Sequence, residues 1–225
     1  MRSRILQQIS RPRLDGEISE YLNRMQNVDL NKKIDDARIV CIDLETTGLH
    51  TRRSNIVSMG GIAIKKKALD VKDSIFLLVK CEGRIDRESV LVHKITPSLL
   101  TDALELDNAL KNVLGFVGND VICSFSSFDC FFLNRDLRRI FGIPLLNPTV
   151  DVQKLGRKLL LSKDPYDRQL LDAEWVGLEE LAARMKVPVV SRHTSVGDAY
   201  TMALALVGLI KKYKIETVKQ LYALS

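Results

Sequence analysis

Residues 37–49 read A-R-I-V-C-I-D-L-E-T-T-G-L, and this stretch decides the fold. Its apolar run 39–42 predicts a central strand that is buried on both faces of a sheet. Asp43 and Glu45 are separated by one residue of that strand, so their side chains leave the same face. Burying carboxylates is costly without a cation or polar partner, so the pair indicates a site. Residues 46–48 predict a sharp turn at the strand end, and a charged strand edge capped by that turn is the structural alternative.

Two more strands are predicted at residues 55–64 and 74–80, and the short glycine-containing links favour an antiparallel meander. Thr96 and Pro97 are typical of a helix N-cap followed by proline at the first helical position. The remaining predicted elements are helix 107–117, strand 121–125, helix 128–140, strand 149–152, helix 153–161, helix 178–186 and helix 194–213. Strands first and alternation afterwards predict an α/β fold, a mixed sheet with helices on its faces.

The polar and charged residues 1–35 predict an N-terminal helical extension ahead of a main domain at 36–225. The apolar face of this extension consists of Ile18, Tyr21, Leu22 and Met25. That face either packs on the main domain or contacts a partner or a second copy of the chain. Residues 162–175 are polar with an apolar tail and indicate no function.

The 225 residues include 34 lysines and arginines against 28 aspartates and glutamates, a net charge of +6 that permits a polyanionic partner without requiring one. The longest apolar run, residues 202–210, is too short to span a membrane, and no apolar segment follows the basic N-terminus as in a secretory signal. The four cysteines form no C-x-x-C pair, which argues against a disulfide framework or a thiolate metal site. We therefore expect a cytoplasmic protein without a membrane segment.

Two further places carry residues that suit a site. Asp129 follows the strand 121–125 at the start of a helix, where aspartate is also a common cap. In R-H-T-S-V-G-D-A, Thr194 or Ser195 would cap a helix, so His193 lies in the preceding loop and Asp198 in the first turns. The two side chains would then reach one point from different directions, although a lone histidine beside an arginine is more often a surface residue.

The order I-D-L-E-T-T-G-L, F-D and H-T-S-V-G-D-A resembles the DEDDh exonuclease family over about residues 39–212. The similarity is greatest to the proofreading branch associated with bacterial DNA polymerase III, with ribonuclease T and oligoribonuclease as relatives. Lesser matches are V-H-K-I-T at 92–96, T-V-D-V-Q-K-L-G-R at 149–157 and L-E-E-L-A at 178–182. The resemblance implies a ribonuclease H-like fold and makes residues 36–225 an exonuclease domain.

The resemblance assigns metal ligation to Asp43, Glu45, Asp129 and Asp198. Their hard carboxylate oxygens suit two divalent cations, Mg²⁺ or Mn²⁺, held about 3.5–4 Å apart. His193 would accept the proton of the attacking water, because its ordinary pKa lies near working pH. The terminal nucleotide would contact Thr46, Leu49, Val92 and His93, although His93 is also suited to capping the next helix.

The implied activity is 3′–5′ exonuclease cleavage at single-stranded 3′ ends, with DNA favoured over RNA because the polymerase-associated branch matches best. An oligoribonuclease-like or RNA-trimming enzyme is the alternative. A weakened nucleic-acid-binding module is another, because Ser124 and Phe125 stand where many members carry histidine and asparagine. Phosphate contacts are predicted among Arg135, Arg138, Arg139, Arg157, Lys158 and Arg192, and a solvated helix face explains each of these equally well.

The final residues K-Q-L-Y-A-L-S, 219–225, loosely resemble a sliding-clamp peptide but lack its paired terminal hydrophobic residues. We interpret them as a helix end. Contact with a polymerase or a sliding clamp stays open, as does the oligomeric state.

Overall fold

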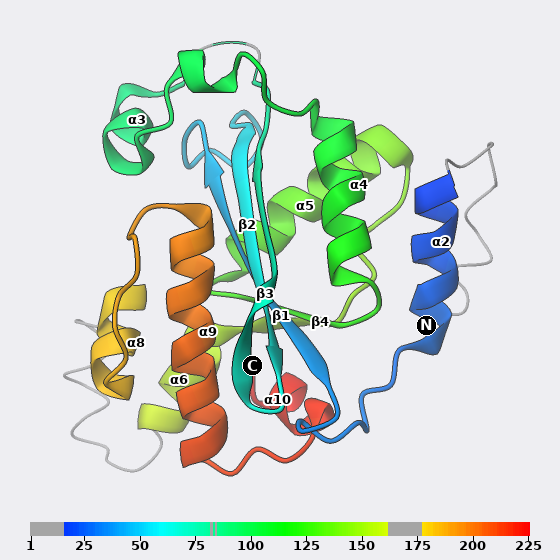
Figure 1. Ribbon diagram of the computed structural model, residues 1–225, viewed down its shortest axis with the longest axis vertical. Coiled ribbons are helices and arrows are strands. Elements are labelled where there is room, and N and C mark those ends of the chain that lie inside the picture. The colour runs from blue at the N-terminus through cyan, green and yellow to red at the C-terminus, as the bar shows by residue number, and fades with distance from the viewer. Residues whose placement is uncertain (1–15, 82, 84, 162–176) are drawn as a thin grey trace.

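The computed structural model describes residues 16–81, 83, 85–161 and 177–225. At its centre lies one five-stranded sheet in the order β3-β2-β1-β4-β5 (Figure 1). The strands are β1 (Arg38–Thr46), β2 (Ile56–Lys65), β3 (Ala68–Leu78), β4 (Val121–Ser124) and β5 (Thr149–Asp151). β1, β2 and β3 pair antiparallel, whereas β4 pairs parallel with both β1 and β5. The mixed sheet confirms the predicted α/β class.

Helices cover both faces of the sheet (Figure 1). One group, which packs with Val40 and Ile42 of β1, comprises α2 (Gly16–Arg24), α4 (Leu106–Val117) and α5 (Ser127–Phe141). The other group, which packs with Ile39 and Cys41, comprises α6 (Val152–Leu161), α8 (Leu178–Met185), α9 (Ser195–Lys212) and α10 (Val218–Leu224). Successive residues of β1 therefore enter opposite cores, as the period of a strand requires.

The N-terminal apolar face packs on the rest of the chain. Ile18, Tyr21 and Met25 are buried in the core that contains α4 and α5. The Tyr21 hydroxyl donates to Asn147 Oδ1 at 2.8 Å and accepts from the Leu146 amide, so the ring's polar end is also satisfied. A short 3-10 turn, η1 (Met25–Asn27), leads from α2 toward β1. Residues 1–15 of the predicted extension lie outside the described residues. The segment 162–175, for which the sequence indicates no function, also lies outside them.

The third strand begins earlier than the predicted 74–80. β2 and β3 are joined through Lys66 and Lys67, whose φ angles of 51° and 57° are left-handed. Such two-residue hairpin turns favour Asn-Gly or Asp-Gly, so a pair of lysines gives no turn signal. The strand 68–78 continues directly from this turn. Its residues are exposed or half-buried without a regular alternation, so the hydrophobic pattern of the sequence does not predict the whole strand.

Two short segments precede the helix at 106–117: the first is not predicted, and the second begins at the predicted helix start, Thr96 and Pro97. α3 (Arg87–His93) ends at Lys94, whose φ of 60° closes the helix, and η2 (Pro97–Leu100) follows Thr96 with proline at its start. α10 occupies the predicted helix end, and its Val218 and Leu221 are buried in the core around α9. Among the described residues, no helix combines the length and apolar character needed to cross a membrane.

Candidate active site

A gap between β1 and β4 opens the space for the site. The two strands pair in parallel only from Ile39 to Cys41, and β4 ends at Ser124. Beyond Cys41, the Leu44 amide has no strand partner on that side, and it donates instead to Asp129 Oδ1 at 3.1 Å. Asp129 lies in the first turn of α5 and is buried. Ligand sites of α/β sheets commonly lie at the carboxyl ends of diverging strands.

Three of the predicted acids meet at this gap. One carboxylate oxygen each from Asp43, Glu45 and Asp198 lie within 4.8 Å of one another. The first two come from the face of β1 that α9 covers, and Asp198 comes from the first turn of α9. Asp129 lies close enough to raise the pKa of Asp43 and of Glu45 electrostatically. The structure therefore brings together three of the four acids, from β1 and α9, and places Asp129 of α5 within electrostatic range of them.

A glycine allows α9 to approach the sheet. A Cβ atom on Gly60 of β2 would overlap the backbone of Ser195, so only glycine fits there. Beside it, the buried hydroxyls of Ser58 and Ser195 lie 2.6 Å apart and form a hydrogen bond. Ser195 therefore fastens α9 to β2, while Thr194 is the N-cap, its Oγ1 accepting from the Gly197 amide at 3.2 Å. These contacts set the height of Asp198 above the sheet.

The loop before α9 carries His193 in a left-handed conformation, with φ 61°. The His193 amide donates to Asp198 Oδ2 at 3.2 Å, which fixes this unusual backbone against the acid cluster. Gly197 makes room for the loop, because a Cβ atom there would overlap the Ser191 carbonyl. The structure thus places His193 in the loop and Asp198 in the helix, as the sequence predicts, and its role as base remains a prediction.

Arg192 lies between two acids. Its Nη1 donates to Asp198 Oδ2, and its Nε donates to Glu179 Oε1 of α8 at 3.0 Å. The sequence places Arg192 among candidate phosphate contacts and does not reveal this ion pair, since residues 192 and 198 are not neighbours in either a helix or a strand. Glu179 belongs to the L-E-E-L-A match at 178–182, and nothing in that match indicates a role for its side chain.

The acids raise one another's pKa values. Burial, followed by repulsion from Asp198 and Asp129, raises the pKa of Glu45 from 4.5 to about 7. Burial also raises the pKa of Asp129 to about 7. The hydrogen bond from the Leu44 amide acts in the opposite direction and lowers this pKa. The pKa of Asp43 is raised well above its ordinary value by burial and by its acidic neighbours. A site that penalises negative charge in this way favours a bound cation.

The donor set fits a hard divalent cation. Asp198 Oδ1 is buried and has no hydrogen-bond partner among the described residues, although such an atom ordinarily has one. It belongs to the same carboxylate whose other oxygen is taken by Arg192 and His193. Clustered carboxylate oxygens without a thiolate are the ligands of Mg²⁺ and Mn²⁺. Asp43, Glu45, Asp129 and Asp198 are therefore the residues that could hold metal ions.

The predicted substrate contacts gather around the turn after β1. Thr46 is buried, and its hydroxyl donates to the Gly48 carbonyl at 2.7 Å, whereas Leu49 is 86% exposed. α3 lies against this turn, because the Asp86 amide donates to the Thr47 carbonyl at 3.0 Å.

α3 supplies the other two predicted contacts. Val92 is 46% exposed, and His93 is buried at the helix end. The ring Nδ1 accepts from the Ile95 amide at 3.0 Å, and burial lowers the pKa of His93. Its Nε2 forms no hydrogen bond of ordinary geometry with the described residues, and it is the only such buried side-chain atom there besides Asp198 Oδ1. The four residues remain predicted contacts.

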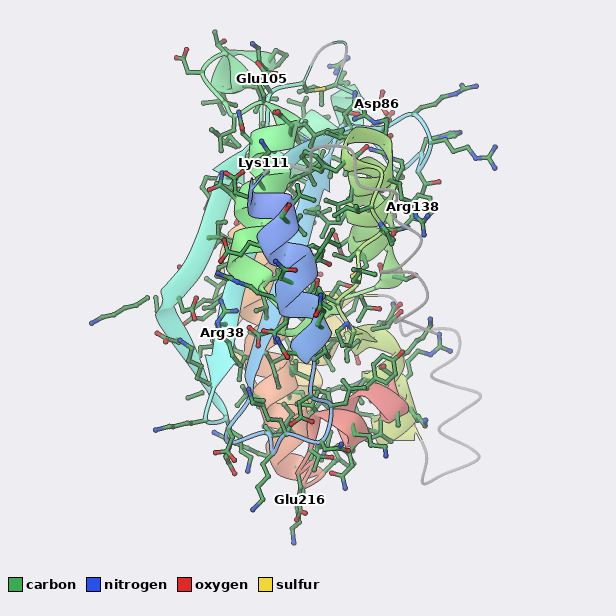
Figure 2. The ribbon with its side chains drawn as sticks, turned by 90° about the vertical axis from the view of Figure 1, so that its right-hand side faces the viewer. Arg38, Asp86, Glu105, Lys111, Arg138 and Glu216 are labelled. Atoms are coloured by element: carbon green, nitrogen blue, oxygen red, sulfur yellow. The ribbon has the colours of Figure 1, made fainter. Side chains whose placement is uncertain are left out.

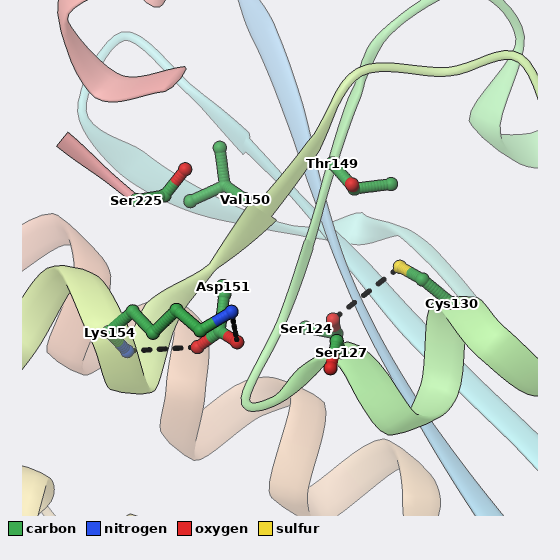
Figure 3. A pocket seen from close by; sticks show the side chains of 8 residues that line it. All are labelled: Ser124, Ser127, Cys130, Thr149, Val150, Asp151, Lys154 and Ser225. Atoms are coloured by element: carbon green, nitrogen blue, oxygen red, sulfur yellow. Dashed lines mark hydrogen bonds and ion pairs between the residues drawn. The ribbon is translucent and has the colours of Figure 1, made fainter. Parts of the chain in front are cut away.

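A small cavity of about 160 Å³ at the ends of β4 and β5 has none of the four acids in its lining (Figure 3). Ser124 lines it, and the Ser124 hydroxyl donates to the Ser126 carbonyl and lies 3.5 Å from Cys130 Sγ. Phe125 packs against the core around α9. Ser124 and Phe125, which depart from the family pattern, are therefore both accommodated: Ser124 by hydrogen bonding and Phe125 by packing.

A family model described as RNase_T, Exonuclease, matches residues 40–206. The chain belongs to the RNase_T exonuclease family. Members of this DEDDh family are 3′–5′ exonucleases, hydrolases that depend on metal ions, so the predicted family and enzyme class are confirmed. The DNA polymerase III PolC-type of Thermotoga petrophila is 23% identical over 208 residues, 91% of this chain and 14% of that protein. The exonuclease chain thus spans about one seventh of the length of such relatives.

Solved structures show the same fold. Exonuclease X in complex with 5′ overhanging duplex DNA superposes with a TM-score of 0.60 at 18% identity, covering 83% of this exonuclease and 98% of that chain. The nuclease domain of 3′hExo, a DEDDh family member bound to rAMP, superposes with a TM-score of 0.62 at 16% identity, covering 78% and 92%. The ribonuclease H-like fold predicted for this exonuclease is therefore confirmed.

Proposed function

We propose that this chain is a metal-dependent exonuclease that removes nucleoside 5′-monophosphates from the 3′ end of single-stranded DNA. The observation that carries the proposal is the cluster of the Asp43, Glu45 and Asp198 carboxylates, with Asp129 near enough to raise the pKa of Asp43 and with Asp198 Oδ1 buried and unpaired within the described part of the chain. A binding module gains nothing from such mutually repelling acids, whereas phosphodiester hydrolysis needs them.

Each residue has a distinct task in this proposal. Asp43, Glu45, Asp129 and Asp198 hold two divalent cations, Mg²⁺ or Mn²⁺. When bound, the ions supply charge neutralisation at the scissile phosphate and a more acidic water. His193 accepts the proton of the water whose oxygen attacks phosphorus, and the bond from phosphorus to the 3′ oxygen breaks. The products are a nucleoside 5′-monophosphate and a strand with a free 3′ hydroxyl.

DNA is the proposed substrate because the matched relatives are DNA polymerases of the PolC type, and because Exonuclease X was solved with DNA. Leu49 and Val92 offer exposed apolar surface around the turn after β1 for the terminal nucleotide, and the buried Thr46 and His93 belong to the same turn and to α3. We also retain the division into an extension at 1–35 and an exonuclease domain at 36–225, and a polymerase or sliding-clamp contact, as predictions.

The test uses 5′-labelled single-stranded DNA and RNA oligonucleotides with Mn²⁺, Mg²⁺ or chelator. Wild type is compared with Asp43→Asn and Asp198→Asn, which keep the side-chain shape and remove one negative charge. We expect a metal-dependent ladder that shortens from the 3′ end and is lost in both variants, with DNA cleaved faster than RNA. Faster cleavage of RNA would move the protein to the RNA-trimming branch. Binding of either polymer without cleavage would overturn the enzymatic proposal.

A further inference from the structure

The loop after the acidic strand exposes two neighbouring arginines. Arg52 and Arg53 lie seven and eight residues beyond Glu45, and both are exposed. Neither forms an ion pair within the residues that the structure describes. The loop itself is ordered by internal bonds, since the Thr47 amide donates to the Asn55 carbonyl at 2.8 Å and the Ser54 amide donates to the His50 carbonyl. The two positive charges are therefore held on a defined backbone.

Arg135 of α5 fastens this loop to the helix that carries Asp129. Its Nη1 donates to the carbonyls of Thr51 and Ser54, each at 2.8 Å, so the two anchored carbonyls flank residues 52 and 53. Arg135 also donates to the fully buried Asp136, from Nη2 to Oδ2 at 2.6 Å and from Nε to Oδ1 at 3.1 Å. Its guanidinium carbon lies 4.4 Å from the centre of the Phe132 ring. Arg135 is thus committed to holding the loop and is not a free phosphate contact.

One turn farther along α5, Arg138 adds a third exposed charge. Residues three apart share a helix face, so Arg138 lies on the side of α5 that Arg135 occupies. Figure 2 shows Arg138 on the outer side of α5, away from the sheet. Its Nε donates to Asn134 Oδ1 at 3.3 Å, and it has no carboxylate partner among the described residues. The nearby Asp136 is already paired with Arg135 and Arg139.

We propose that Arg52, Arg53 and Arg138, here called the arginine surface, bind backbone phosphates of the substrate strand upstream of its 3′ end. The inference deepens the proposed function, on which it rests. Arginine suits this task because its planar fork pairs with phosphate and is weakly hydrated. Arg52 and Arg53 lie on a loop anchored in advance and Arg138 lies on a helix, so binding a polyanion requires no ordering of the backbone that carries these three charges.

The position of the arginine surface predicts which nucleotides it contacts. Arg138 follows Asp129 by nine residues of one helix, which corresponds to about 14 Å at 1.5 Å per residue. A stacked strand advances about 3.4 Å per nucleotide. The arginine surface therefore lies about four nucleotides from the acids. A trinucleotide bound at the acids would not reach it, whereas a 12-mer would.

The experiment measures binding in chelator, where no hydrolysis occurs, by fluorescence anisotropy of 5′-labelled DNA of three, six and twelve nucleotides. The test protein carries Arg52→Gln, Arg53→Gln and Arg138→Gln together. The matched control carries Lys211→Gln, Lys212→Gln and Lys219→Gln, which remove the same charge from exposed positions in the last turn of α9 and in α10. In Figure 1 these helix ends lie at the opposite end of the molecule from α3.

For the 12-mer we expect the test protein to bind at least tenfold more weakly than wild type. We also expect the slope of log K against log salt concentration to be smaller in magnitude by about 2, because three lost contacts with single-strand phosphates contribute about 0.7 each. The trinucleotide should bind all three proteins equally. Equal weakening in the control protein, or weakening of the trinucleotide by the same factor, would overturn the inference.

A second readout separates this inference from the proposed function. Hydrolysis of a chromogenic thymidine 5′-phosphodiester needs the acids but cannot reach the arginine surface. If that substrate and the oligonucleotides are not cleaved while length-dependent binding persists, the proposed function fails and the inference stands as a nucleic-acid-binding surface. If cleavage is normal and the test protein binds the 12-mer like wild type, the inference alone fails.

Discussion

Arg192 and Asp198 form an ion pair that uses only one oxygen of the carboxylate. Nη1 of Arg192 and the His193 amide both donate to Oδ2, and Oδ1 stays buried without a partner in the described part of the chain. The same guanidinium lowers the pKa values of Asp43, Glu45 and Asp198. Arg192 therefore orients Asp198, a predicted metal ligand, and partly offsets the mutual repulsion of the clustered carboxylates.

Replacing Arg192 with glutamine should move the acidic limb of the pH–rate profile to higher pH. Arg192 lowers three carboxyl pKa values, so its removal raises them and fewer acids are ionised at a given pH. Each unit of increase lowers the rate by up to about tenfold below the pKa and scarcely changes it above. The measurement is kcat/KM from pH 5.5 to 9 at subsaturating Mn²⁺. Arg192→Lys keeps the charge and should resemble wild type; coincident acidic limbs for all three proteins would contradict the prediction.

Metal ions should stabilise the protein more at pH 8 than at pH 5.5. Glu45 and Asp129 have folded pKa values of about 7, above their ordinary values of 4.5 and 3.8. Between those values the folded state binds more protons than the unfolded state, so metal-free stability falls as pH rises from about 4 to about 7. A cation at 100 times its Kd adds about 2.7 kcal/mol, or about 5–10 °C in Tm.

Thermal unfolding with Mn²⁺ or chelator at both pH values checks this. Asp43→Asn removes one predicted ligand and should reduce the Mn²⁺ shift at pH 8. A shift of equal size at pH 5.5 and pH 8 in wild type would show that the acids do not compete with protons for the ion.

Gly60→Ala should impair both stability and hydrolysis. The added methyl group would overlap the Ser195 backbone and push the start of α9 from the sheet. Overpacking of this kind costs about 1–3 kcal/mol, and a displacement of about 1 Å at a reacting group can cost about a hundredfold in rate. Gly115→Ala is the matched control, because its methyl group meets nothing within 4 Å in an exposed turn of α4. It should add about 0.5–1 kcal/mol and leave hydrolysis unchanged, as urea unfolding and a cleavage assay would show.

Arg135→Met should raise KM for oligonucleotides more than it lowers kcat. The change removes two hydrogen bonds to the loop that carries Leu49 and two to the buried Asp136, which keeps its pairing with Arg139, and it leaves the acids of β1 in place. We expect KM to rise about tenfold, since each such bond contributes about 0.5–1.5 kcal/mol. Steady-state kinetics on one 12-mer gives both constants, with Arg24→Met in the exposed pair with Glu20 as control. A fall in kcat at constant KM would instead place Arg135 in the chemical step.

The sequence is most informative where the signal is local. The alternation along β1 places Asp43 and Glu45 on one face because a strand has a period of two, and Thr194 caps α9 because a hydroxyl suits that position. The strand at 68–78 is missed at its start because Lys66 and Lys67 adopt left-handed angles that lysine seldom takes.

Contacts between distant segments are not readable in the same way. Asp129 reaches the other acids because the pairing of β1 with β4 ends at Cys41. The point where two strands stop pairing depends on both strands together, so neither stretch of sequence predicts it. The pairing of Arg192 with Asp198 and Glu179 depends on how α8 and α9 pack. Only the family resemblance connects His193 and the four acids before the structure is known, and their individual roles remain predictions.

The acids come from β1, α5 and α9, which lie far apart along the chain. Asp43 and Glu45 already share one face of β1, whereas Asp129 and Asp198 join them only when α5 and α9 pack on the sheet. A nascent or partly unfolded chain therefore lacks a complete set of metal ligands. Hydrolysis by the proposed site therefore requires the completed fold, because the acid cluster does not exist before α5 and α9 are packed on the sheet.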